Sequence, residues 1–130
     1  MGQCTSVRIG AAYVLRLEGS FLTDQDAVLI EESFPAPSAD VRCVVVNWSG
    51  IVTINSTSLG AVMRGEMDIS RHGVRFRNCA FSPRAEKIVR PFRHSFPWNY
   101  FDTEELAVEA CTQEAPDDIR WAAQRKADTT

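Results

Sequence analysis

The sequence predicts an α/β fold in which a mixed β-sheet of about four to five strands has about four helices packed against it. Segments with strand-like and helix-like patterns alternate along most of the chain, which indicates parallel neighbouring strands joined by helices. Residues 41–48 form a nearly continuous β-branched run, which is typical of a strand buried on both faces. The length of 130 residues and the 45% hydrophobic content fit one domain with its own core.

Two strands and a helix are predicted before the buried strand. Residues 7–9 have strand character, and residues 14–19 alternate apolar and polar side chains, as half-buried strands do. Thr23 and Asp26 have the spacing of a capping box at a helix start. Pro35 is expected to end that helix, because proline has no amide hydrogen. The predicted core-facing positions of this helix are Ala27, Ile30 and Phe34.

The middle of the chain continues this alternation. A turn at Ser49–Gly50 is predicted to follow the buried strand and to lead into a further extended segment, residues 51–54. The next helix is predicted to begin after Asn55 and to end at residues 71–73, where a cation precedes a glycine. Two glycines inside this helix indicate close packing against a neighbour. Its predicted apolar positions are Leu59, Val62, Met63 and Met67.

The last third of the chain is predicted to hold two strands and two helices. Residues 74–81 form the first of these strands, and Ser82–Pro83 then caps and starts a helix that Pro91 ends. Residues 96–101 are a short extended segment, and Asp102–Thr103 caps the final helix. The predicted apolar positions of that helix are Leu106, Ala107, Ala110 and Cys111.

The predicted domain spans residues 7–113, with residues 1–6 as an N-terminal tail and 114–130 as a C-terminal tail. The net charge of −3, from 14 Lys+Arg and 17 Asp+Glu, argues against a nucleic-acid binder, which usually carries a basic excess. No apolar run approaches the roughly 18 residues that cross a bilayer, and the N-terminus lacks the pattern of a secretory signal. We therefore expect a cytoplasmic protein without a membrane span.

Neither the cysteines nor the histidines form a metal-binding or catalytic pattern. The four cysteines are Cys4, Cys43, Cys79 and Cys111. They are far apart in the sequence, so reduced thiols are expected rather than disulfides or zinc ligands. His72 is interpreted as a helix-end cation and His94 as a surface-loop residue. Known enzyme motifs such as a Gly-rich phosphate loop are absent from the sequence, which predicts no enzyme activity, no cofactor and no metal.

One polar segment, Asn55–Ser58, lies where a buried strand is expected to end and a helix to begin. Capping the helix needs only one such side chain, yet three consecutive hydroxyls follow Asn55. Open α/β sheets place functional groups beyond the carboxyl ends of their strands. The segment is therefore either a simple helix cap or a candidate site with a hydroxyl that can accept a phosphate.

Residues 44–60 (VVVNWSGIVTINSTSLG) resemble the core of the STAS domain, the fold of bacterial anti-sigma factor antagonists. The family pattern is an apolar strand, an acidic or polar turn, and then Asp-Ser-(Ser/Thr/Ala)-Gly-Leu-Gly at the start of a helix. Ser82–Pro83 and residues 96–107 resemble later elements of the family in the same order. The resemblance covers residues 7–113 and implies a STAS-like mixed sheet with helices against it.

The resemblance implies a regulatory binding module. In this family, the unphosphorylated protein binds an anti-sigma factor that is a serine kinase of the histidine-kinase-like ATPase fold, which frees the sigma factor. Phosphorylation of a serine at the helix start ends the binding, and a PP2C-type phosphatase reverses it. Ser56 matches the phosphoacceptor and Thr57 the residue after it. The residues predicted to contact the partner are Asn55, Ser56, Thr57, Ser58 and Arg64. Arg64 begins a basic stretch that runs to Arg93 and contains eight basic residues.

Two departures from the family pattern leave alternatives open. Asn55 stands where the family has an acidic residue, and Ser58 stands where it has glycine. Ser56 is therefore either a phosphorylation switch or part of a scaffold that is not phosphorylated. Further alternatives are a small subunit of a stress-signalling complex or of a lipid or anion transporter. An enzyme with Ser56 or Ser58 as nucleophile would need a nearby histidine. The oligomeric state is left open.

Overall fold

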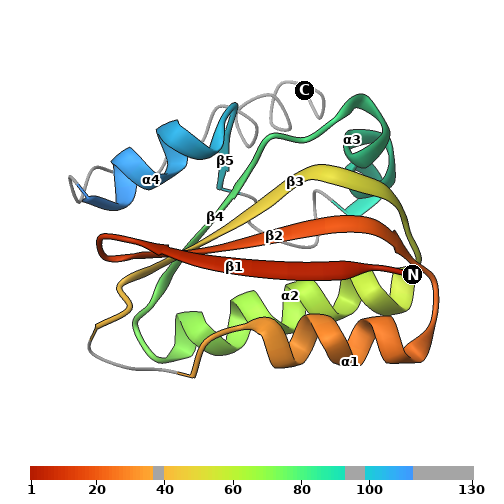
Figure 1. The fold of residues 1–130 in the computed structure, drawn as a ribbon, viewed down its shortest axis with the longest axis horizontal. Coiled ribbons are helices and arrows are strands. Elements are labelled where there is room, and N and C mark those ends of the chain that lie inside the picture. The colour runs from red at the N-terminus through yellow and green to blue at the C-terminus, as the bar shows by residue number, and fades with distance from the viewer. Residues whose placement is uncertain (37–39, 93–98, 113–130) are drawn as a thin grey trace.

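The structure follows the alternation of strands and helices that the sequence predicts. The computed structural model describes residues 1–36, 40–92 and 99–112 (Figure 1). In chain order, the elements are β1 (Gln3–Ile9), β2 (Ala12–Phe21), α1 (Asp24–Ser33), β3 (Cys43–Ile54), α2 (Ser56–Arg71), β4 (Arg75–Cys79), α3 (Pro83–Val89), the 3-10 helix η1 (Arg90–Phe92), β5 (Tyr100–Phe101) and α4 (Glu104–Thr112). Over the described residues, the predicted order of elements is confirmed.

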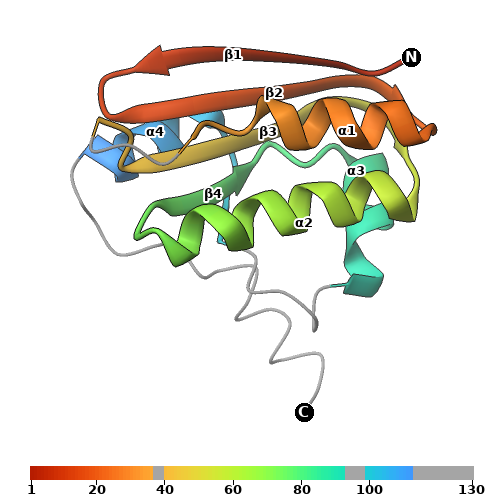
Figure 2. The same cartoon turned by 90° about the horizontal axis from the view of Figure 1, so that it is seen from below.

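The strands form a mixed sheet in the order β1-β2-β3-β4-β5. Strand β1 pairs antiparallel with β2, whereas β2–β3, β3–β4 and β4–β5 are parallel pairs. Helices α1 and α2 cover one face of the sheet, and α4 lies on the other (Figures 1 and 2). The predicted α/β class, with a mixed sheet between layers of helices, is therefore confirmed.

Strand β3 is buried on both faces, as its composition predicts. Val44 and Val46 belong to the larger hydrophobic core, which also contains Ile30 of α1. Val45 belongs to a smaller core, together with Ala107 of α4. Because consecutive side chains of a strand point to opposite faces, an unbroken β-branched run supplies apolar side chains to both cores.

Strand β3 continues through Ser49–Gly50, so the turn predicted there is wrong. The ladder with β2 contains a bulge at this point, where two residues of β3 lie opposite Leu17. Gly50 approaches β2 closely, because a Cβ atom at this position would lie 2.9 Å from the carbonyl oxygen of Leu17. The glycine marks a close approach inside the sheet and not a reversal of the chain.

Strand β1 begins at Gln3, so residues 3–6 belong to the sheet and not to a tail. They pair antiparallel with residues 15–18 of β2. The backbone amide of Gly2 also donates a hydrogen bond to the carboxylate of Asp26 on α1, at 3.2 Å. The sequence gives no signal for the first part of β1, because an edge strand exposed on both faces does not alternate apolar and polar residues.

The predicted helix starts are confirmed, whereas two predicted core positions are not. The capping box of Thr23 and Asp26 is present at α1, and Ser82 caps α3. Met67 on α2 and Leu106 on α4 are exposed to 46% and 47%, although their helical spacing predicted that both face the core. Both lie at the margin of an apolar face, where spacing alone does not determine burial.

A disulfide joins Cys43 at the start of β3 to Cys111 near the end of α4. The prediction of four reduced thiols is therefore wrong for this pair, while Cys4 and Cys79 are free. The two bonded residues are 68 positions apart, and their Cα atoms lie 5.9 Å from each other. The packing of α4 on the sheet brings the two cysteines together. Their spacing in the sequence does not predict this disulfide.

Candidate functional site

The candidate site lies where β3 ends and α2 begins. Asn55 is the N-cap of α2, and its Oδ1 accepts a hydrogen bond from the backbone amide of Ser58 at 2.8 Å. The amide of Asn55 donates to the carbonyl oxygen of Phe21 at 2.9 Å, which ties the start of α2 to the end of β2. The helix therefore begins at the carboxyl end of a central parallel strand, as predicted.

The three hydroxyl side chains that follow Asn55 have different environments. Ser56 and Thr57 are exposed in the first turn of α2, so both hydroxyls are accessible at the surface. Ser58 is fully buried, and among the described residues its Oγ has no hydrogen-bond partner. The side chain of Ser58 is therefore not part of the exposed surface that was predicted to contact a partner. Its backbone amide donates the hydrogen bond that caps α2.

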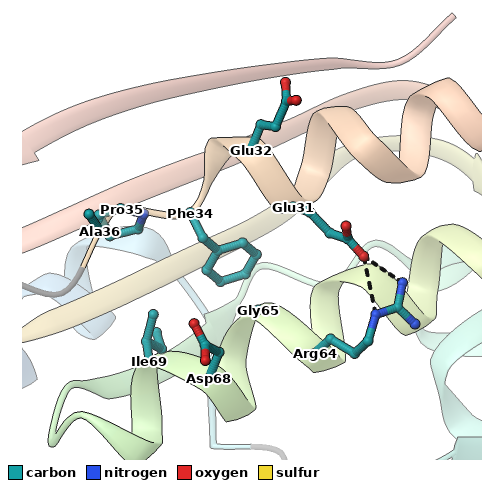
Figure 3. A pocket seen from close by; sticks show the side chains of 9 residues that line it. All are labelled: Glu31, Glu32, Phe34, Pro35, Ala36, Arg64, Gly65, Asp68 and Ile69. Carbon is teal, nitrogen blue, oxygen red and sulfur yellow. Dashed lines mark hydrogen bonds and ion pairs between the residues drawn. The ribbon is translucent and has the colours of Figure 1, made fainter.

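Arg64 lies about two turns further along α2, on the side that faces α1 (Figure 3). Its Nη2 forms a salt bridge with Oε1 of Glu31 at 2.6 Å, and both side chains are exposed. Such an exposed pair contributes at most about 1 kcal/mol to stability. Arg64 lines a groove between α1 and α2 together with Phe34 and Ile69. The structure does not bring Arg64 together with the hydroxyls.

The Asn55→Ala variant is expected to lower the free energy of unfolding by about 1 kcal/mol, because it removes the cap bond to Ser58. Ser56→Ala is the matched control and should change this free energy by less than about 0.5 kcal/mol, as for other exposed positions. Denaturant unfolding of both variants measures the difference. An equal loss in both would contradict the assignment of the cap to Asn55.

Among the described residues, the one histidine, His72, lies far from the serines at the start of α2. His72 is exposed at the C-cap of α2, about 24 Å along the helix axis from Ser56, and its Nδ1 lies 2.9 Å from the carbonyl oxygen of Asp68. His94 lies outside the described residues. Within the described ranges there is no group of three or more side chains that could hold a metal ion. Nor is any described helix both long and apolar enough to cross a membrane.

A buried polar chain beneath α2 was not predicted from the sequence. Trp48 Nε1 donates to Asn78 Oδ1 at 2.8 Å, and Asn78 Nδ2 donates to Glu66 Oε2 at 3.2 Å. Burial raises the pKa of Glu66 to about 8, so this carboxyl is mostly protonated at neutral pH. The sequence did contain one signal, because Glu66 lies between Val62 and Ile69 on the apolar face of α2. The chain links β3, β4 and α2 and thereby helps to orient the helix.

A second polar cluster holds the start of α4 on the other face of the sheet. Glu104 accepts two hydrogen bonds from Arg16, at 2.9 and 2.8 Å, and one from Asn47 at 3.0 Å. The Arg16 guanidinium holds the pKa of Glu104 below its usual value. Arg77, from the basic stretch of the sequence, is buried with Nη1 2.7 Å from the Sγ of Cys43. The basic stretch therefore does not form a single exposed surface.

No protein-family model and no curated protein matches the chain, whereas several solved structures match its fold. An anti-sigma factor antagonist from Mycobacterium paratuberculosis superposes with a TM-score of 0.69 and 16% identity, over 86% of this chain and 95% of that chain. The anti-sigma factor antagonist SpoIIAA in its unphosphorylated form superposes with a TM-score of 0.66 and 17% identity, over 88% of this chain and 100% of that chain.

A protein of another kind has a similar fold. A sulfate transporter family protein from Wolinella succinogenes superposes with a TM-score of 0.67 and 12% identity, over 79% of this chain and 86% of that chain. The chain therefore has the fold of STAS-domain proteins, as the resemblance of residues 44–60 predicted. Because these sequence identities lie between 12% and 17%, the structural similarity establishes the fold alone.

Proposed function

We propose that this chain is a STAS-type anti-sigma factor antagonist, which acts as a binding module and not as an enzyme. Its partner is an anti-sigma factor that is a serine kinase of the histidine-kinase-like ATPase fold. The observation that carries the proposal is the pair of exposed hydroxyls, Ser56 and Thr57, at the amino end of α2. The likeness of the fold to anti-sigma factor antagonists supports it. By holding the kinase, the chain frees the sigma factor and regulates transcription.

The proposed switch is the transfer of the γ-phosphoryl group of ATP to the Oγ of Ser56, with release of ADP and the hydroxyl proton. The phosphate adds a charge of about −1.5 to −2 at the positive end of the α2 dipole. The first turn of α2 has no acidic residue, and the cap Asn55 is neutral, so neither repels the phosphate. The fold therefore tolerates the modification, and the charge acts on the interface with the partner. A PP2C-type phosphatase would restore the hydroxyl by hydrolysis.

We expect Ser56→Asp to weaken binding to the kinase by about 100-fold or more, because burying an unpaired charge at an interface costs about 3 kcal/mol. Ser56→Ala should bind within about threefold of the wild type, since it preserves an uncharged surface. Isothermal titration calorimetry with each serine-kinase anti-sigma protein of the source organism measures both affinities. An intact-mass spectrum of the chain from its own host, with one added phosphate on Ser56, would support the switch directly.

Thr57→Ala and Thr57→Asp are the matched controls, because Thr57 is also exposed in the same helical turn. If Thr57→Asp alone weakens binding, the phosphoacceptor is the neighbouring residue. Equal binding of Ser56→Ala and Ser56→Asp would overturn the switch and favour a scaffold that is not phosphorylated. Absence of binding to every such kinase would overturn the anti-sigma role itself.

The second candidate is a small STAS subunit of a lipid or anion transporter or of a stress-signalling complex. The likeness to the sulfate transporter family protein is the observation that favours it. Affinity purification of the chain from its own host separates the two candidates. Recovery with an ABC-type ATPase or a permease, and without a serine kinase, would support the transporter subunit. Recovery in a particle of much larger mass without either would support the signalling complex.

A further inference from the structure

A groove of about 600 Å³ runs between the C-terminal part of α1 and the C-terminal half of α2 (Figure 3). Phe34 and Ile69 contribute to its apolar lining. Phe34 lies directly against Gly65, where a Cβ atom would come within 2.5 Å of the aromatic ring. Because Phe34 is only half-buried, the groove offers an aromatic surface to a further apolar side chain.

The polar lining of the groove is mainly acidic. Glu31, Glu32 and Asp68 line it together with a single cation, Arg64. Arg64 neutralises the charge of Glu31 through their salt bridge, so the lining of the groove has a net charge of −2. Figure 3 shows this pair at one side of Phe34 and Asp68 beside Ile69. The groove therefore fits a basic segment that carries an apolar anchor.

The chain itself contains a segment of this kind. Residues 119–126 (IRWAAQRK) lie outside the described part of the structure, and their sequence has three basic residues and no acidic one. Ile119 and Trp121 are the large apolar side chains of the segment. Tryptophan is among the side chains that contribute most when they occupy a pocket at an interface. The charge and the apolar character of the segment both complement the groove.

The position of α4 makes the groove accessible to this segment. Helix α4 ends at Thr112, at the same edge of the sheet at which α1 and α2 end (Figures 1 and 2). Trp121 follows Thr112 by nine positions, which span up to about 30 Å of extended chain. Packed layers lie about 10 Å apart, so the layer of α4 and the layer of α1 and α2, on opposite faces of the sheet, are separated by about 20 Å. The extended chain is therefore long enough to pass from one layer to the other.

We propose that residues 119–126 bind the groove between α1 and α2 of the same molecule. In this arrangement Trp121 contacts the apolar lining, and the basic side chains face Glu32 and Asp68. The proposal does not depend on phosphorylation at the start of α2.

NMR spectra of the ¹⁵N-labelled full chain test this proposal. The Trp121→Ala variant is expected to shift the amide resonances of Gly65, Ile69 and Glu32, because the ring leaves the groove. Thr129→Ala, near the end of the chain, is the matched control and should leave these resonances in place. Raising the salt concentration to 0.5 M should move the same resonances in the wild type, because it screens the charge pairing.

A second variant tests the groove from its own side. Asp68→Lys is expected to shift the indole N–H resonance of Trp121, whereas Glu105→Lys on the distant helix α4 should not. Groove resonances that coincide in the wild type and in Trp121→Ala would overturn the proposal. Resonance positions that change with protein concentration would overturn the intramolecular arrangement and identify a second copy of the chain as the occupant.

Discussion

Replacing Cys43 and Cys111 together by alanine is expected to lower the free energy of unfolding by about 4 kcal/mol. The disulfide between them closes a loop with a sequence separation of 68 residues. Removing it increases the conformational entropy of the unfolded chain, and the chain-entropy relation for a loop of this length gives about 4 kcal/mol. The loss should affect α4 most, because its contribution to the core includes small side chains such as Ala107 and Ala110.

Denaturant unfolding with and without dithiothreitol measures this effect. The reductant should lower the unfolding midpoint of the wild type to that of the double alanine variant and leave the variant unchanged. Cys4→Ala is the matched control, because Cys4 is a free thiol and its replacement leaves the disulfide intact. A wild-type midpoint that does not respond to the reductant would contradict the prediction.

The free energy of unfolding is expected to fall as the pH rises from about 5 to about 9, and Glu66 contributes most to this dependence. Burial raises the pKa of its carboxyl from 4.5 to about 8. Between these values the folded state retains a proton that the unfolded state releases, which costs the folded state roughly 1 kcal/mol for each pH unit. The contribution of the neutral carboxyl is complete below pH 4.5 and is lost as the pH rises through about 8.

The Glu66→Gln variant should remove this part of the pH dependence. Glutamine keeps an acceptor for Asn78 Nδ2 and carries no charge that burial would penalise. We expect the variant to be more stable than the wild type by roughly 2 to 4 kcal/mol at pH 9 and similarly stable at pH 5. Urea unfolding at pH 5, 7 and 9 measures this difference, with the exposed Glu105→Gln as control. If the variant and the wild type lose stability in parallel, the assignment to Glu66 is wrong.

Helix starts depend on neighbouring residues and are predicted correctly from the sequence, whereas the turn predicted at Ser49–Gly50 is wrong. The capping box joins Thr23 to Asp26, and the cap of α2 joins Asn55 to Ser58, so each involves atoms only three residues apart. Local residue types determine such contacts, because few other atoms are within reach. The β-branched run of β3 likewise predicts burial on both faces, because strand side chains alternate whatever lies against them.

The candidate site is predicted in part. The position of Ser56 and Thr57 at the start of a helix follows from the local pattern. The burial of Ser58 depends on which side of α2 faces the sheet, which is determined by the packing of the whole helix. The pairing of Arg64 with Glu31 depends on the placement of α1, since the two residues are 33 positions apart.

The sequence by itself determined the order of strands and helices, the helix starts and the position of the hydroxyl segment at the carboxyl end of β3. Only the tertiary structure decided which distant residues meet, as in the disulfide of Cys43 with Cys111 and the chain from Trp48 through Asn78 to Glu66. These contacts join residues 12 to 68 positions apart. Local conformational preference acts over a few residues, whereas contacts at such separations form only when whole elements pack against each other.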